Sequence, residues 1–323
     1  MKLEKLLYWG FSFFMPVGFL YLPKQKNMNP SPLVFSPMII GTMRLGEWGV
    51  KMTTSELEAF IEECLALELK DFDHADIYGH YTTESDFGKV LKNRSDLRAK
   101  IRLTTKCGIK LITPNRPSHT IKSYDSTKAH IIASAEHSLK ELSTDYLDLF
   151  LIHRPDFLMN PTEIAEAFES LRNSGKVNYF GVSNFTPSQF DLLNSYTPLT
   201  NNQIEASVLH LNPFQDGTLD QCLKHKIQPT AWSPLGGGAI FQKSENPQII
   251  RIKRVAQIIA DKHNVQLDQI LFAWLLKHPA SIIPVLGTSK INRIQAALEA
   301  TKINLSHEEW YQLWEASTGH EVA

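Results

Sequence analysis

The chain of 323 residues is poor in cysteine and has almost no net charge. Its three cysteines, Cys64, Cys107 and Cys222, are widely spaced and form no Cys-x-x-Cys pair. This argues against a disulfide framework or a structural zinc site and favours the reducing cytoplasm. The 33 basic and 34 acidic residues give a net charge of −1, so the basic excess typical of nucleic-acid binding is missing. We therefore expect a cytoplasmic protein with no nucleic-acid partner.

The first 34 residues are predicted to be an apolar N-terminal extension of uncertain role, followed by one domain over residues 35–323. Residues 6–22 form an apolar and aromatic run that Pro16 interrupts, and no small-x-small cleavage pattern follows it. Three interpretations stay open: a dispensable tail upstream of Met28, a membrane anchor or interfacial segment, and a cleaved signal. Any membrane contact is expected only through residues 6–22, with membrane association as the alternative to a cytoplasmic location.

From residue 35 onward, short apolar runs alternate with amphipathic stretches of helical spacing. The predicted strands are 37–42, the first part of 71–79, 101–109, 146–153, 177–185, 200–205, 228–232 and 281–288. The segment 71–79 is predicted to hold the second strand and its outgoing loop. The main predicted helices are 57–69, 84–91, 127–141, 161–173, 217–225, 248–264, 267–277 and 290–300. Capping boxes at 53–56 and 306–309, and Thr186-Pro187, mark further helix starts.

Eight strands separated by helices predict a single-domain α/β fold, the (β/α)8 or TIM barrel. A doubly wound sheet is the other α/β architecture, and it binds dinucleotides through G-x-G-x-x-G. That motif does not occur here, and the only glycine-rich stretch, 236–238, comes late in the chain. The pattern therefore favours the barrel.

Polar residues occupy the ends of three successive predicted strands, where barrel enzymes place their catalytic groups. Asp73 and Tyr78 come from the second strand, Lys106 from the third and His153 from the fourth. Taken singly, each has an ordinary explanation as a structural ion pair, a core histidine or packing. Their placement at successive strand ends indicates a catalytic site.

The sequence resembles the aldo-keto reductase superfamily from about residue 35 to the end. The resemblance rests on FDHADIYG, the lysine in LTTKCG, LFLIHRPD, GVSNF, the glutamine in NNQIEAS, AWSPLGGG and PVLGTSKINRI. Within the superfamily, HADIYG, LIHRPD and DGTLDQ are most similar to the bacterial YdhF-like oxidoreductases. The resemblance implies that Asp73, Tyr78, Lys106 and His153 form a catalytic tetrad. Tyr78 would donate a proton to the substrate oxygen, and the Lys106 ammonium would lower the pKa of Tyr78.

The resemblance also implies an NADP(H) site along the second half of the barrel. Its expected contacts are Ser183, Asn184, Gln203, Trp232, Ser233, Leu235, Gly236, Gly287, Thr288, Ser289, Lys290 and Arg293. Arg293 stands where the family binds the 2′-phosphate of NADP, which favours NADP over NAD. Ala296 and Ala297 depart from the family, because many members carry polar adenine contacts there.

The resulting prediction is an NADP-dependent oxidoreductase that transfers hydride between nicotinamide and a small aldehyde or ketone. Trp48 is a candidate substrate contact at the barrel mouth. The alternative is a nucleotide-binding regulatory subunit of the same fold with slow turnover. A metal-dependent hydrolase using His74, Asp76, His80 and His153 is disfavoured, because no His-x-His pair occurs and Lys106 and Tyr78 would have no role. No metal is therefore expected, and the pattern leaves the substrate and the oligomeric state open.

Overall fold

Eight parallel strands close into a barrel in the computed structural model, which describes residues 33–323. Around the barrel the order is β1-β10-β9-β8-β7-β6-β3-β2. The strands are β1 (Ile39–Gly41), β2 (Asp71–Asp73), β3 (Arg102–Cys107), β6 (Leu147–Ile152), β7 (Val177–Ser183), β8 (Asn202–Glu205), β9 (Thr230–Trp232) and β10 (Ile283–Leu286). The predicted (β/α)8 barrel is confirmed, and its parallel strands end on the same face.

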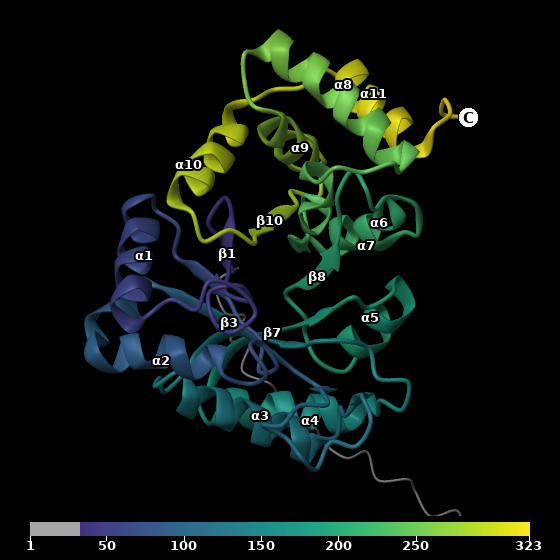
Figure 1. Cartoon of the computed structure of the whole chain (residues 1–323). Helices are drawn as coiled ribbons and strands as arrows, with labels where there is room; N and C mark the ends of the chain where they lie inside the picture. The colour runs from purple at the N-terminus through teal and green to yellow at the C-terminus, as the bar shows by residue number, and fades with distance from the viewer. Residues whose placement is uncertain (1–32) are drawn as a thin grey trace, which may run out of the picture. The chain divides into compact units, whose positions relative to one another are not determined.

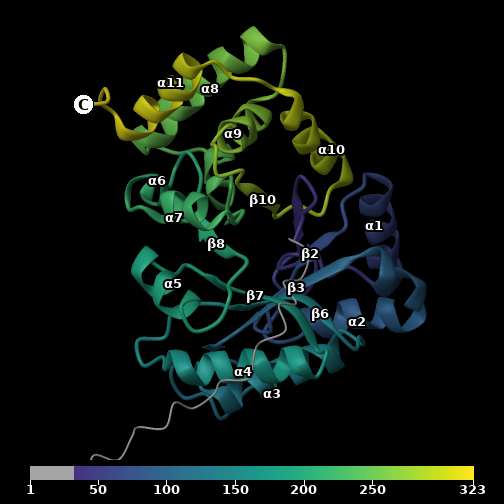
Figure 2. The same ribbon diagram turned by 180° about the vertical axis from the view of Figure 1, so that it is seen from behind.

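Helices follow the strands and lie outside the barrel, as Figures 1 and 2 show from opposite sides. They are α1 (Thr54–Ala66), α2 (Thr83–Asn93), α3 (Lys128–Glu141), α4 (Pro161–Asn173), α5 (Pro187–Asn194), α6 (Asn212–Gln215), α7 (Thr218–His225), α8 (Pro247–His263), α9 (Leu267–Leu276), α10 (Ile291–Glu299) and α11 (His307–Thr318). The short 3-10 helices are η1 (Ser95–Lys100), η2 (Gly236–Phe241) and η3 (Ala300–Lys302).

Local sequence signals fix where several helices begin. Thr53 and Ser306 cap α1 and α11 with the predicted reciprocal capping boxes, whose glutamates are Glu56 and Glu309. Thr186 caps α5 in the same way, with Pro187 at the first helical position. In each case a side-chain oxygen accepts a hydrogen bond from a backbone N–H that has no partner within the helix. These helix starts could therefore be predicted without tertiary information.

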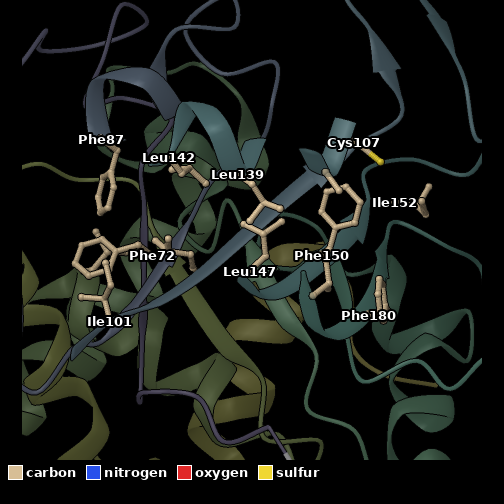
Figure 3. Packing of buried hydrophobic residues seen from close by; sticks show 14 of the residues in the cluster. Phe72, Phe87, Ile101, Cys107, Leu139, Leu142, Leu147, Phe150, Ile152 and Phe180 are labelled. Carbon is tan, nitrogen blue, oxygen red and sulfur yellow. The ribbon is translucent and has the colours of Figure 1, made fainter. Parts of the chain in front are cut away.

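The main hydrophobic cluster packs the outer faces of β2, β3, β6 and β7 against the helices that cover them. Figure 3 shows Phe72 of β2 beside Phe87 of α2, with ring centroids 5.4 Å apart. Phe180 of β7 stacks on Phe168 of α4 at 4.2 Å. These rings are almost fully buried, so removing them from water is a large favourable term in folding.

A second hydrophobic cluster joins α8, α9 and α11 on another side of the barrel. Trp274 of α9 and Trp310 of α11 stack at 4.9 Å with an interplanar angle of 9°. Each indole N–H donates to the other residue's backbone carbonyl, at 3.0 and 3.1 Å. Trp314 also stacks on Trp310, and their ring centroids are 5.5 Å apart. This tryptophan stack attaches the C-terminal helix to the barrel.

The structure corrects the end of the third predicted strand and locates the end of the second. The predicted strand 101–109 ends at Cys107, because Gly108 takes a φ of 104° and turns the chain. An antiparallel pair then follows, β4 (Ile109–Lys110) with β5 (Ser123–Tyr124). Within 71–79, predicted as a strand and its outgoing loop, the strand ends at Asp73. The residues beyond Asp73 turn at the barrel mouth, and this turn places Tyr78 near the strand ends.

Residues 1–32 of the predicted N-terminal extension lie outside the described residues, so the domain boundary and the interpretation of 6–22 stay predictions. Within residues 33–323, no helix combines the length and the apolar character needed to cross a bilayer.

Candidate active site

The four predicted catalytic residues meet at the carboxyl ends of β2, β3 and β6. Asp73 is the last residue of β2, Lys106 lies in β3, and His153 directly follows β6. Tyr78 reaches the same place from the turn after β2, where its ring lies 6.1 Å from that of His153. Tyr78 and His153 are partly exposed, whereas Asp73 and Lys106 are 2% and 0% exposed. The structure therefore brings all four predicted residues together.

The Lys106 ammonium is hydrogen-bonded to three groups of the site. Its Nζ donates hydrogen bonds to Asp73 Oδ2 at 2.8 Å, to the His74 carbonyl at 2.6 Å and to Tyr78 Oη at 3.3 Å. An ammonium group has three N–H donors, and each of them has an acceptor here. A fully buried lysine is tolerated only when it is paired and hydrogen-bonded in this way. The site thus holds a positive charge directly beside the tyrosine hydroxyl.

The electrostatics of Tyr78 differ from the expectation in sign. Burial raises the pKa of Tyr78, and this outweighs the lowering by Lys106, so the net direction is upward. Burial also acts to lower the pKa of Lys106, but attraction to Asp73 and Tyr78 raises it overall. Lys106 therefore stays charged, and Tyr78 keeps its proton at neutral pH. The expected lowering by Lys106 is present, but it only moderates the effect of burial.

His153 is held as a neutral imidazole. Burial, followed by the nearby charges of Lys106, Arg154 and Lys122, holds the pKa of His153 well below its usual value. Its backbone N–H donates to the Cys107 carbonyl at 2.8 Å, and its Nδ1 is buried with no hydrogen-bond partner among residues 33–323. A neutral imidazole offers one donor and one acceptor to a neighbouring polar group.

Two of the residues considered for a metal site, His74 and His80, make other contacts. The Nδ1 of His74 lies 3.0 Å from Thr42 Oγ1, and burial followed by the charge of Lys106 lowers the pKa of His74 to about 3. His80 packs edge-on against Trp48 at 5.2 Å. The described part of the chain contains no group of three or more His, Cys, Asp or Glu side chains that could hold a metal ion.

A buried acidic pair behind the tetrad was not predicted. Burial raises the pKa of Asp76, and the neighbouring Glu84 raises it further. Burial also raises the pKa of Glu84 to about 7, although Thr105 Oγ1 donates a hydrogen bond to it at 2.5 Å. Glu84 lies in the first turn of α2, where an acidic residue is ordinary, so the sequence carries no signal of its burial.

The pKa of Glu84 predicts how stability depends on pH. Because its folded pKa of about 7 exceeds the ordinary 4.5, the fold favours the neutral acid. This contribution is complete below pH 4.5 and is lost as the pH rises through 7. Relative to Glu84→Gln, wild-type protein should lose about 1–3 kcal/mol of unfolding free energy between pH 5 and pH 8. Urea unfolding of both proteins at the two pH values measures this; equal losses would contradict the assignment.

The side chains expected to contact the nicotinamide form a chain of hydrogen bonds. Trp232 Nε1 donates to Asn184 Oδ1 at 2.9 Å, and Asn184 Nδ2 donates to Ser183 Oγ at 2.7 Å. Ser183 Oγ donates to the Gln203 carbonyl at 2.9 Å. Gln203 Nε2 donates in turn to Asp73 Oδ1 at 2.9 Å. The predicted cofactor contacts and the predicted tetrad are therefore physically connected, which the sequence did not indicate.

Two loops supply the space and charge that a dinucleotide would need. Gly236 has a φ of 58°, in the left-handed region that favours glycine, and a Cβ there would press on the Leu209 side chain. A Cβ at Gly287 would meet no atom within 4 Å, which leaves open space after β10. No side chain of the described residues caps the N-terminus of α10, where Lys290 and Arg293 are exposed. Free amides and two cations suit a phosphate.

The other predicted contacts lie in these same two loops. Ser233 has a φ of 51°, and its carbonyl accepts a hydrogen bond from Gly236 N at 2.8 Å. Leu235 packs against both hydrophobic clusters. Thr288 and Ser289 are partly exposed, and Thr288 Oγ1 accepts a hydrogen bond from Lys290 N at 3.2 Å. The residues present therefore fit the expected cofactor.

Aromatic side chains border the mouth beside Tyr78. Trp48, the predicted substrate contact, lies 6.2 Å from the Tyr78 ring. The Arg154 guanidinium lies 5.4 Å from the centroid of the Trp232 ring. Arg154 follows His153 directly and was missed as a candidate, although the LIHRPD segment contains it. Aromatic rings and a guanidinium beside the Tyr78 hydroxyl suit a small polar substrate.

The fold and the site together define a (β/α)8 barrel with a buried lysine beside a tyrosine at the strand ends, and comparison with known proteins gives the family. The family model for the aldo/keto reductase family matches residues 37–317, so the chain belongs to this family. Its members generally use nicotinamide cofactors. This confirms the resemblance inferred from the motifs.

Curated relatives extend over almost the whole chain. The chain is 46% identical to the uncharacterized oxidoreductase YcsN of Bacillus subtilis, over 92% of this chain and 99% of the relative. It is 42% identical to the oxidoreductase YdhF of Escherichia coli, over 92% and 98%. A 6-dehydroglucose reductase of Agrobacterium fabrum is 40% identical, over 93% and 100%. The predicted similarity to YdhF-like oxidoreductases is confirmed.

A solved structure has the same barrel. It is the crystal structure of the thermostable aldo-keto reductase Tm1743 with the inhibitor epalrestat, which is 28% identical. The match covers 87% of this chain and 95% of that chain, with a TM-score of 0.72.

Proposed function

We propose that the protein is an NADPH-dependent reductase of aldehydes or ketones in which Tyr78 exchanges a proton with the substrate oxygen. One observation carries the proposal: the Lys106 ammonium donates hydrogen bonds to both Asp73 and Tyr78 at the mouth of the barrel. A structural ion pair would need only Asp73. The contact with the hydroxyl of this partly exposed tyrosine places a phenol, stabilised on ionisation by a cation, at the end of the barrel where we propose that the substrate binds.

When bound, the nicotinamide supplies a hydride to the carbonyl carbon. Negative charge then develops on the carbonyl oxygen, and the Tyr78 hydroxyl transfers its proton to that oxygen. Lys106 stabilises the phenolate that remains, while Asp73 holds Lys106 in place. Neutral His153 orients the carbonyl through a hydrogen bond from its ring N–H.

The same geometry sets the pH dependence of the two directions. The raised pKa of Tyr78 keeps the phenol protonated at neutral pH, so reduction has its proton donor. Oxidation of the alcohol requires a phenolate to accept the proton, so it should accelerate as the pH rises toward the pKa of Tyr78.

The preference for NADPH is proposed from the loop that leads into α10. Arg293 and Lys290 are exposed there beside uncapped backbone amides, a combination that suits the extra phosphate of NADP. Ala297 is 1% exposed and packs in the main hydrophobic cluster, so that position contributes no polar adenine contact. Cofactor binding would then depend more on the phosphate contacts. The three free, buried thiols are consistent with a cytoplasmic location.

The proposed substrate is a small carbonyl compound. Two relatives carry the name 6-dehydroglucose reductase, at 40% and 33% identity. A hydroxylated sugar aldehyde of this kind therefore heads the compounds to test, followed by aromatic and aliphatic aldehydes and ketones.

Steady-state turnover of this panel, followed by the loss of NADPH absorbance, tests the proposal. We expect turnover with NADPH to exceed that with NADH, and Arg293→Leu to narrow the difference by raising the KM for NADPH. Calorimetric binding of NADPH without turnover of any compound would favour the regulatory subunit instead. One tightly held zinc per chain in dialysed, active protein would favour the metal-dependent hydrolase.

A further inference from the structure

Gln203 reaches across the barrel to the tetrad. It lies in β8, whereas Asp73 ends β2, and these strands are on opposite sides of the eight-stranded ring. The Gln203 Nε2 nevertheless donates to Asp73 Oδ1 at 2.9 Å, and the two residues are 3% and 2% exposed. A buried hydrogen bond to a charged carboxylate is stronger than one between neutral groups. Gln203 is therefore a direct partner of the group that holds Lys106.

The two ends of the Gln203 amide have different surroundings. Asp73 is acceptor-only when ionised, so the amide N–H2 must face it and the amide oxygen must point elsewhere. Asp73 Oδ2 is bonded to Lys106, which leaves Oδ1 to Gln203. Within residues 33–323, no side chain donates a hydrogen bond to Gln203 Oε1. The amide oxygen is thus available to an N–H donor outside the chain.

We propose that Gln203 is a positioning residue that couples the nicotinamide site to proton transfer, holding Asp73 through its amide nitrogen while its amide oxygen receives the carboxamide N–H2 of the cofactor. The inference rests on the proposed function, because it assigns the open oxygen to a nicotinamide. It gives Gln203 a role that contact with the cofactor alone would not. Through Asp73 and Lys106, its placement determines where the ammonium lies relative to the Tyr78 hydroxyl.

The sign of the effect follows from the charges around Tyr78. Lys106 lowers the pKa of Tyr78, whereas Asp73 and Asp76 raise it, and neutral His153 packs against the ring. The N–H dipole of Gln203 offsets part of the negative charge of Asp73. Removing this dipole exposes that charge more fully and leaves Lys106 drawn toward Asp73. Both effects raise the pKa of Tyr78.

Gln203→Met keeps the volume of the side chain and removes the amide. Asn184→Gly is the matched control: it alters the same predicted cofactor contacts, leaves the Asp73 bond in place, and suits the φ of 61° at that position. Gln203→Asn is a second variant, one methylene too short to reach Asp73 and still polar. Thermal melting establishes that each variant is folded.

The first experiment needs no cofactor. Fluorine NMR of protein labelled with 3-fluorotyrosine follows the titration of Tyr78, whose signal is the one missing from Tyr78→Phe. We expect both Gln203 variants to raise the pKa of Tyr78 by about half a pH unit or more. Asn184→Gly should leave the titration at the wild-type position. An unchanged titration in the folded Gln203 variants would overturn the proposal.

The second experiment uses catalysis at saturating cofactor. For alcohol oxidation, kcat should rise with pH as Tyr78 ionises. In Gln203→Met this rise should shift to higher pH, by the same amount as the pKa of Tyr78 measured by NMR. Asn184→Gly should raise the KM for the cofactor, and its kcat should rise at the same pH as in the wild-type protein. If Gln203→Met raises only the KM, Gln203 is a cofactor contact and no more. Failure of the proposed function would instead appear as absent turnover in wild-type protein, and the NMR titration would still decide on Gln203.

Discussion

Replacing Tyr78 with phenylalanine is expected to lower the rate of carbonyl reduction by about 100- to 10,000-fold, the usual contribution of a positioned proton donor. The reason is local: the Tyr78 hydroxyl is the group that Lys106 Nζ approaches at 3.3 Å, and phenylalanine removes only that oxygen. The ring contacts with Trp48 and His153 remain, so folding should be unaffected. Single-turnover reduction of the best substrate from the panel, with NADPH saturating, measures the chemical step.

Tyr81→Phe is the matched control for this substitution. Tyr81 lies three residues further on, and its hydroxyl donates to the Ile109 carbonyl at 3.2 Å and accepts from Leu111 N at 3.0 Å. Its loss should leave the chemical step within a few-fold of wild type. A Tyr78→Phe variant that also stayed within tenfold of wild type would exclude Tyr78 as the proton donor.

Replacing Lys106 with methionine should lower the unfolding free energy by about 3–5 kcal/mol, as expected when one partner of a buried ion pair is removed. Lys106 and Asp73 side chains are 0% and 3% exposed, so the remaining carboxylate would have no cation and little water. Urea unfolding at pH 7 measures the change. The variant should also lose carbonyl reduction, because the phenolate of Tyr78 would lack its stabilising charge.

Two further variants separate this effect from a general loss of charge. Lys89 pairs with Asp86 at 2.9 Å, but the side chains are 59% and 38% exposed, so Lys89→Met should cost only about 0–1 kcal/mol. In the Lys106→Met background, Asp73→Asn removes the unpaired charge and should restore part of the stability. A double variant less stable than Lys106→Met alone would contradict the electrostatic explanation.

Much of the fold follows from local sequence. Residues 161–173 were predicted to be helical and form α4 with the same bounds, because Asn160 caps the helix and Pro161 opens it. The antiparallel pair β4 and β5 was missed, because strands of two residues are too short to show alternation. The segment 71–79 was predicted as a strand with its outgoing loop, and the structure places the boundary between them after Asp73.

Part of the candidate site could likewise be predicted from the sequence, and part could not. Asp73, Lys106 and His153 could be located from the sequence, because the end of a strand is a local feature and parallel strands end on one face. The hydrogen bond from Gln203 to Asp73 joins residues 130 positions apart on opposite sides of the barrel. The net upward shift in the pKa of Tyr78 depends on burial, which no local pattern shows. Glu84 was overlooked for the same reason.

The tryptophan stack has an optical consequence. Trp274 and Trp310 lie nearly parallel at 4.9 Å, close enough for their excited states to couple and give a paired band in circular dichroism. That band should report attachment of α11 to α9. Trp48 and Trp232 lie instead around the mouth, where a bound nicotinamide would quench their fluorescence. One chain therefore carries two sets of chromophores: one reports on the C-terminal helix, and the other would report on nicotinamide binding under the proposed function.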